Sequence, residues 1–222
     1  MQLTVSNGSP RGRKSNSTLL MEHFLKGFHS IEGNVSEIIY LHKVEETDKN
    51  VRAFESAEHA IMIFPLYTGA MPGVVKQFIE ALEPMCDRTD NPSLGFIIQS
   101  GFPEPVHSRY VARYMEKLAK RLGCPHTGTV IRGGVEGIRV QPPWMTKRLY
   151  RAFFDLGEAY AETGRFDEKT IRKLAPRERL SAGRKLFFRI LMAIGISNMY
   201  WNRMLKRHNA FEKRFAHPCK DF

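Results

Sequence analysis

The first residues able to do chemistry lie between 7 and 18, in a segment rich in glycine, serine and basic side chains. This segment follows a short β-prone run and precedes an amphipathic helix predicted over 16–29. At the start of such a helix, unpaired N–H groups and the positive end of the helix dipole converge, which suits a phosphate. The pattern therefore favours an anion site. A plain strand-to-helix loop, in which a serine or threonine caps the helix, is the competing interpretation.

Two familiar phosphate motifs are absent from this segment. No Gly-Lys-Ser or Gly-Lys-Thr ends it, so the sequence gives no support to hydrolysis of a Mg-nucleotide. It also lacks the Gly-x-Gly-x-x-Gly spacing of a dinucleotide-binding loop. Any phosphate bound there belongs to another class of site.

Two further loops have side chains suited to a ligand. Residues 65–73 combine Tyr67 with small residues and two prolines, which predicts a rigid, partly apolar wall for a flat heteroaromatic ring. Residues 99–104 form a second turn rich in small residues. Each loop taken alone is also compatible with an ordinary connection between a strand and a helix.

Alternating strands and helices must position these loops. Apolar runs predict strands at 3–6, 35–41, 60–64, 94–99 and 127–131, and helical periodicity fills the intervals at 16–29, 48–57, 73–82, 106–122 and 144–163. Such alternation implies parallel βαβ units in an open, doubly wound α/β sheet. In that architecture the ligand binds beyond the carboxyl ends of the strands, which is where all three loops lie.

The chain resembles a known family. Gly8-Ser9-Pro10-Arg11, the run from Ser15 to Thr18, and the segment from Pro65 to Gly73 are similar to flavodoxin-like NAD(P)H-dependent FMN reductases and quinone reductases. The similarity covers roughly residues 1–163. It implies a five-stranded parallel sheet of order 2-1-3-4-5, FMN as cofactor, NADPH or NADH as electron donor, and a homodimer.

The resemblance also implies a set of site residues. Ser9, Arg11, Ser15, Asn16, Ser17 and Thr18 would hold the 5′-phosphate; Pro65, Leu66, Tyr67, Thr68, Gly69, Ala70 and Met71 would line the isoalloxazine edge; Ser100, Gly101 and Phe102 would close the other side. Tyr67 is the candidate for contact with the substrate, and backbone N–H groups from Gly69 to Met71 would stabilise negative charge on the reduced ring.

The function expected from this resemblance is hydride transfer from NAD(P)H to a quinone, a flavin or another small acceptor. A flavodoxin-type electron carrier is the alternative, although such carriers tend to be acidic and this chain has a formal net charge of +11. A third hypothesis is an interaction protein that kept the fold without the flavin.

Cysteine and histidine usage limits the other cofactors. Residues 41–60 contain no cysteine, which excludes the iron–sulfur cluster that some relatives bind there, and the histidines show no metal-ligand spacing. Cys86, Cys124 and Cys219 are widely spaced and odd in number, as expected for reduced thiols in the cytoplasm. The N-terminal residues read as a strand rather than a signal peptide.

Residues 164–222 form a basic extension that the family pattern does not cover. They contain 15 Lys and Arg against 5 Asp and Glu, whereas residues 1–163 are nearly neutral. A helix with a wide apolar face is predicted over 181–196. It could pack on the preceding domain or across a dimer, or residues 181–207 could contact an anionic membrane surface at its periphery. Nucleic-acid binding is disfavoured because the basic residues match no known motif.

Overall fold

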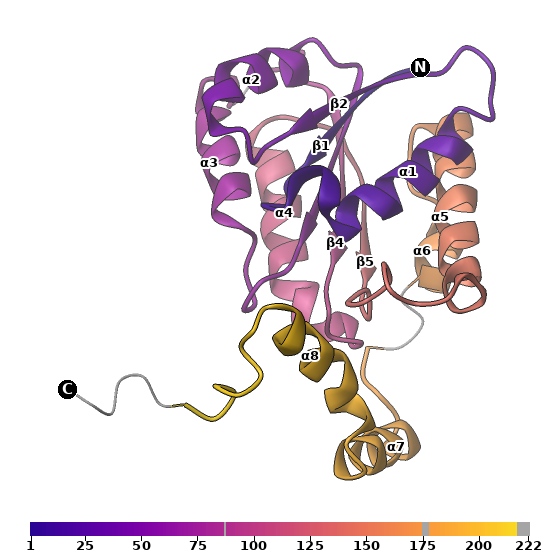
Figure 1. The fold of residues 1–222 in the computed structure, drawn as a ribbon. Helices are drawn as coiled ribbons and strands as arrows, with labels where there is room; N and C mark the ends of the chain where they lie inside the picture. The colour runs from indigo at the N-terminus through magenta and orange to yellow at the C-terminus, as the bar shows by residue number, and fades with distance from the viewer. Residues whose placement is uncertain (87, 175–177, 217–222) are drawn as a thin grey trace. The chain divides into compact units, whose positions relative to one another are not determined.

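The computed structural model describes residues 1–86, 88–174 and 178–216, apart from the side chains at 196, 197 and 200. The chain divides into two compact units, Met1–Arg179, here called the sheet unit, and Leu180–Phe222, here called the tail unit. The sheet unit contains the predicted alternation of strands and helices, drawn in Figure 1.

Five parallel strands form one sheet of order β2-β1-β3-β4-β5. They are β1 (Gln2–Asn7), β2 (Val35–Tyr40), β3 (His59–Pro65), β4 (Ser93–Gln99) and β5 (His126–Arg132). This order and the parallel pairing confirm the predicted flavodoxin-like doubly wound sheet. The order reverses between β1 and β3, so a ligand site is expected beyond the ends of those two strands.

The helices of the sheet unit connect the strands. They are α1 (Asn16–Phe28), α2 (Thr47–Glu55), α3 (Gly73–Ala81), α4 (Arg109–Arg121), α5 (Pro143–Thr163) and α6 (Glu168–Leu174). Short 3-10 turns occur at Gly12–Lys14, Val44–Glu46, Glu83–Met85 and Pro105–Ser108.

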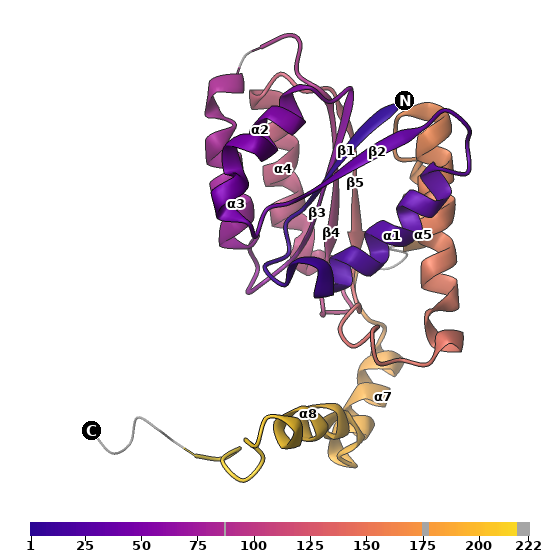
Figure 2. The ribbon, with the colours of Figure 1, turned by 45° about the horizontal axis from the view of Figure 1, so that its top comes forward.

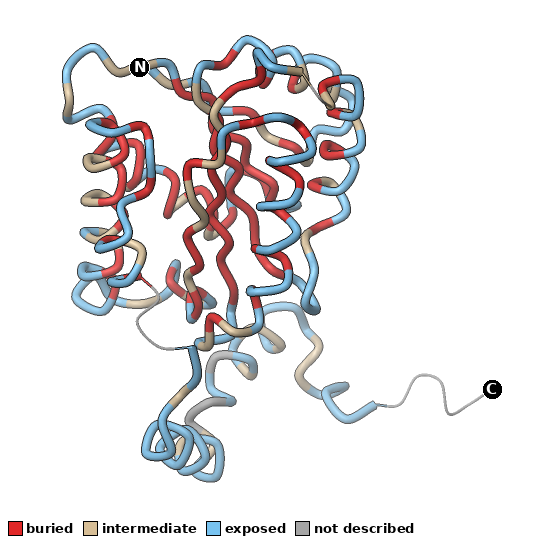
Figure 3. Tube along the Cα trace, turned by 180° about the vertical axis from the view of Figure 1, so that it is seen from behind, coloured by how far each residue is buried: buried red, intermediate tan, exposed pale blue. Residues whose placement is uncertain are grey.

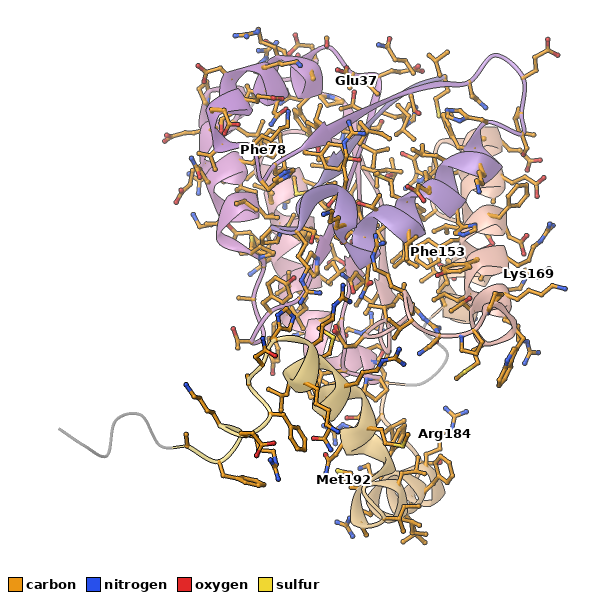
Figure 4. All side chains as sticks on the ribbon, viewed as in Figure 1. Glu37, Phe78, Phe153, Lys169, Arg184 and Met192 are labelled. Atoms are coloured by element: carbon orange, nitrogen blue, oxygen red, sulfur yellow. The ribbon has the colours of Figure 1, made fainter. Side chains whose placement is uncertain are left out.

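The helices cover both faces of the sheet. Helices α1, α5 and α6 pack on one face and α2, α3 and α4 on the other, as the two views in Figures 1 and 2 show. Phe153 of α5 and Phe78 of α3, both labelled in Figure 4, are buried in the two opposite cores. The central strands are buried along almost their whole length (Figure 3). This double coverage explains why β3 and β4 read as continuous apolar runs without alternation.

Local sequence signals set the ends of α5. Pro143 occupies the first turn, where its missing N–H has no partner to lose, and Gly164 ends the helix in a left-handed conformation with φ 67°. Beyond this glycine, Phe166 and Leu174 are buried in the core with α1 and α5. The sheet unit therefore extends to Arg179, further than the boundary at 163 that the sequence pattern predicts.

The tail unit contains α7 (Ala182–Ala193) and α8 (Ile196–Arg207). The single helix predicted over 181–196 is wrong at its end, because Gly195 adopts a left-handed conformation with φ 74° and separates the two helices. In the described part of the chain no helix has the length and apolar character needed to cross a bilayer.

Two of the three cysteines lie in the sheet unit. Cys124 is buried and Cys86 is half-buried, and both are free thiols. Burial raises the pKa of Cys124 to about 12. Cys219 lies outside the described residues.

Candidate functional site

A narrow cleft lies beyond the ends of β1, β3 and β4, at the reversal of strand order. Its lining comes from the three loops singled out in the sequence and from the segment after β5. The lining residues are Ser9, Arg11, Ser15, Asn16, Pro65, Leu66, Tyr67, Gln99, Ser100, Gly101 and Glu136.

The bend between β1 and α1 is fixed by Asn7. This side chain is fully buried; its Oδ1 accepts from the N–H of Ser9 at 3.0 Å, and its Nδ2 donates to Thr18 Oγ1 at 3.0 Å. Gly8 fits the same bend only because it lacks a side chain, since a Cβ there would lie 2.3 Å from Val75 Cγ2. Asn7 is the last residue of β1, and its side chain anchors the bend that follows.

Ser15 caps the start of α1. Its Oγ accepts from the N–H of Thr18 at 3.1 Å, and Thr18 Oγ1 donates to the carbonyl of Gly12 at 3.0 Å. Ser17 is buried, and its Oγ accepts from Gln99 Nε2 at 3.4 Å. The hydroxyls of Ser17 and Thr18 therefore stabilise the bend. The helix geometry leaves the N–H groups of Asn16 and Ser17 without intrahelical partners.

The segment after β5 is hydrogen-bonded to the start of α1. Asn16 Nδ2 donates to the carbonyl of Val135 at 2.9 Å, and Arg139 Nη2 donates to the carbonyl of Ser15 at 2.7 Å. Arg11 lines the cleft, while the guanidinium of Arg13 lies over the ring of Tyr40, 5.2 Å from its centre. The basic side chains of the bend thus have different surroundings, and only Arg11 faces the cleft.

A tight hairpin follows β3. The N–H of Tyr67 donates to the carbonyl of Ala70, and the N–H of Ala70 donates back to Tyr67, both at 2.9 Å. Thr68 and Gly69 form the tip with φ 47° and 82°. The turn holds Tyr67 at the rim of the cleft with 40% of its surface exposed. Of the three expected donors from Gly69 to Met71, Ala70 uses its N–H within the turn, which leaves the N–H groups of Gly69 and Met71 for a ligand.

The loop after β4 forms the opposite wall. Ser100 is buried, and its Oγ donates to the carbonyl of Phe102 at 2.9 Å. Gly101 lies close to Glu136, since a Cβ at this glycine would be 3.3 Å from Glu136 Cβ. Phe102 is exposed and packs against the ring of His107 at 4.9 Å between centres. Glu136 therefore places a negative charge in the same cleft as Arg11.

The structure brings most of the predicted site residues together. Those that line the cleft are Ser9, Arg11, Ser15, Asn16, Pro65, Leu66, Tyr67, Ser100 and Gly101. Those outside its lining are Ser17, Thr18, Thr68, Gly69, Ala70, Met71 and Phe102. Gln99, which lies in the predicted 99–104 turn but was not among the expected site residues, also lines the cleft. Glu136 lines it without having been predicted, because a single residue in a later loop forms no recognisable pattern.

The enclosed space at the cleft floor is small, about 30 Å³. Larger hollows of about 400 Å³ between α3 and α4 and about 880 Å³ along α1 and α5 share no lining residue with the cleft. The cleft floor is nevertheless the better candidate, because polar groups from several loops converge there. Among the described residues no three His, Cys, Asp or Glu side chains are grouped so as to hold a metal ion.

Comparison with known proteins identifies the fold. No protein-family model and no curated protein sequence matches the chain. Among solved structures, an FMN-dependent NADH-azoreductase from Bacillus anthracis in complex with FMN is 15% identical, with a TM-score of 0.57 over 72% of this chain and 100% of that one. An NAD(P)H:quinone oxidoreductase from Methanothermobacter marburgensis is 16% identical, with a TM-score of 0.57 over 71% and 96%. An NADPH-quinone reductase from P. pentosaceus is 15% identical, with a TM-score of 0.52 over 70% and 96%.

Proposed function

We propose that this chain, whose fold is the flavodoxin-like fold of those reductases, is an FMN-dependent oxidoreductase that passes hydride from NADH or NADPH to a quinone, a flavin or another small acceptor. The observation that carries the proposal is a convergence. The N-terminus of α1, the side chain of Arg11 and the rim residue Tyr67 meet at one cleft at the reversal of strand order.

The bend before α1 fits a phosphate group. Its own polar side chains fix its shape, so the N–H groups of Asn16 and Ser17 are held in place before any ligand arrives. Arg11 supplies a positive charge beside them. A dianionic phosphate bound there would be stabilised by both the helix dipole and the guanidinium.

The small enclosed space sets how a mononucleotide would fit. About 30 Å³ is far below the roughly 300 Å³ or more of a pocket that encloses a whole ligand. The floor would therefore hold the phosphate end of FMN, and the exposed rim would hold its ring. Pro65 and Leu66 offer an apolar edge, and the exposed Tyr67 side chain is free to turn against a flat ring.

Bound FMN would supply the capacity to accept and donate hydride, which no side chain of the protein provides. The residues that line the cleft would then orient the ring. The N–H groups of Gly69 and Met71 lie in the hairpin beside Tyr67, where they would stabilise negative charge at the ring edge. We assign the substrate contact to Tyr67, which stands at the open side of the cleft.

An anaerobic titration tests this function. The purified full chain is mixed with FMN, and flavin fluorescence is followed to measure binding; NADH or NADPH is then added without oxygen. We expect saturable binding and loss of the flavin absorbance with at least one donor, followed by its return on addition of a quinone. Binding without reduction by either donor would favour the electron-carrier alternative. A chain that binds no FMN would contradict both.

A further inference from the structure

The tail unit presents an uncovered apolar surface. In α7 and at Ile194 directly after it, large apolar side chains are each between 44% and 60% exposed: Leu186, Phe187, Phe188, Ile190, Met192 and Ile194. Leu186, Phe187 and Phe188 would each bury far more surface in an ordinary packed helix, since large apolar side chains are the usual core residues. Within the described residues, α7 contacts α8, yet these side chains remain exposed.

Two basic side chains lie together on one side of α7. Lys185 and Arg189 are four residues apart and therefore share a face, while Phe187 and Leu191 follow the opposite face. Figure 4 labels Arg184 at the start of the helix and Met192 near its end. A helix with an apolar face and flanking cations is suited to lie in the plane of a membrane surface, where the cations reach the headgroups.

The net charge of the described part of the tail unit indicates which charge its partner carries. Residues 180–216 contain eight Lys and Arg and a single acidic residue, Glu212. No ion pair neutralises these cations within that described segment. A second copy of the chain would bring the same positive charge against itself. A surface rich in anionic lipid offers both an apolar layer and the complementary charge.

We propose that α7, with the basic residues of α8, binds the surface of membranes that contain anionic phospholipids. The apolar side chains of α7 enter the boundary between headgroups and acyl chains. Lys185 and Arg189 remain at the level of the phosphates, and Arg203, Lys206 and Arg207 of α8 add to the attraction. This inference does not depend on the proposed oxidoreductase activity, because its measurement requires neither flavin nor donor.

Co-sedimentation of the full chain with vesicles tests the inference. The vesicles are phosphatidylcholine alone or phosphatidylcholine with phosphatidylglycerol, each at low and high salt. We expect the apparent affinity for the anionic vesicles to exceed that for the neutral vesicles by about tenfold or more, and to fall as salt increases. Failure to bind anionic vesicles would overturn the proposal.

Two pairs of substitutions separate the apolar from the charged contribution. Phe187→Glu with Ile190→Glu is expected to reduce binding by about tenfold or more, because it places charge in the apolar face. Lys185→Gln with Arg189→Gln is expected to weaken binding to anionic vesicles severalfold and to leave binding to neutral vesicles unchanged. All four side chains are exposed, so neither pair disturbs a core.

Matched controls lie on the sheet unit. Val35→Glu with Val44→Glu makes the same kind of change at two exposed valines, and Lys169→Gln with Lys173→Gln removes two cations at the same spacing on α6. Both controls are expected to bind vesicles like the native chain. Equal losses in the controls and the α7 variants would show that net charge alone governs binding, and would overturn the assignment to α7.

Sedimentation velocity tests two other possible partners of the tail unit, a second copy of the chain and a nucleic acid. A native dimer that Phe187→Glu with Ile190→Glu converts to a monomer, without vesicle binding, would assign the apolar face to a second copy. Binding to a nucleic acid that this variant retains, again without vesicle binding, would assign the tail unit to nucleic acid. Either result would overturn the proposal.

Discussion

Gly27 of α1 and Gly157 of α5 each lie against the backbone of the other's helix. A Cβ at Gly27 would be 1.9 Å from the carbonyl oxygen of Phe154, and a Cβ at Gly157 would be 1.9 Å from the carbonyl oxygen of Phe24. The two helices therefore pack as closely as their main chains allow. The N-terminus of α1 forms the candidate phosphate site, so this contact also sets where that site lies relative to the sheet.

Replacing either glycine with alanine is expected to destabilise the sheet unit. Backbone atoms cannot move aside as a flexible side chain can, so the helices must separate, and overpacking of this kind costs about 1–3 kcal/mol. The free energy of unfolding, measured by urea denaturation, checks the prediction. Gly73→Ala is the control, because a Cβ there meets nothing within 4 Å. An alanine at position 27 or 157 that is tolerated as well as one at position 73 would contradict the close approach.

Arg11 and Arg13 are expected to differ in their effect on FMN affinity. Arg11→Ala removes a cation from the cleft and should weaken FMN binding about fivefold to tenfold, in the range of a partly solvated charge-assisted hydrogen bond. Arg13→Ala should have little effect, because that guanidinium lies over Tyr40. Riboflavin, which lacks the phosphate, provides the control ligand. Its affinity should not change in either variant, and a parallel loss for riboflavin would place Arg11 against the ring instead.

Glu136→Gln is expected to change FMN affinity in the opposite direction. The carboxylate lines the same cleft as Arg11, so it repels a bound phosphate at neutral pH. Its removal should tighten FMN binding about twofold to fivefold at low ionic strength, and the gain should shrink as salt screens the charge. The measurement is a fluorescence titration at two salt concentrations. Weaker binding in the glutamine variant would mean that Glu136 accepts a hydrogen bond from the ligand.

His59 is expected to make the stability of the sheet unit depend on pH. Burial lowers the pKa of this imidazole below its ordinary value of 6.5, and the opposing charge of Glu58 only partly offsets that effect. The native state therefore binds a proton less readily than the unfolded chain. Stability is greatest above pH 6.5 and is lost as the pH falls through 6.5 toward the lowered native pKa.

His59→Gln should flatten this pH dependence. The pH dependence is measured by urea denaturation of the native chain and the variant between about pH 5 and 7.5, a range that spans the ordinary histidine pKa. Burial also lowers the pKa of His23, so part of the slope should remain in the variant. The exposed His29 provides a control substitution. An unchanged slope in His59→Gln would contradict the assignment.

The positions of the strands and helices in the sheet unit could be predicted from the sequence. The apolar runs of β3 and β4 and the helical spacing of α1 each have one simple interpretation, and parallel βαβ connections leave few topologies. The end of the sheet unit could not be predicted this way. Whether Phe166 and Leu174 join the core or begin a tail depends on a tertiary contact that their local sequence does not record.

The lining of the candidate cleft could be predicted where a segment supplies it and could not be predicted where a single residue does. The bend before α1 has a recognisable run of glycines and hydroxyls, whereas Glu136 and Arg139 are single residues that reach the cleft through long-range contacts. Two signals could have been used further. Thr68-Gly69 is a turn-prone pair between apolar residues, and Gly27 and Gly157 are isolated glycines within helical patterns, which can mark a close approach of two backbones.

The hairpin that carries Tyr67 closes on itself through paired hydrogen bonds, and among the described residues no backbone hydrogen bond joins its tip residues Thr68 and Gly69 to β3 or α3. Its side chains can consequently be exchanged while β3 and α3 keep their places. The bend before α1 is expected to tolerate substitution less well, because its buried polar side chains hydrogen-bond to one another. If the proposed function holds, we therefore expect selectivity among acceptors to be adjustable at the tip of this hairpin, while the proposed phosphate site at the bend tolerates little change.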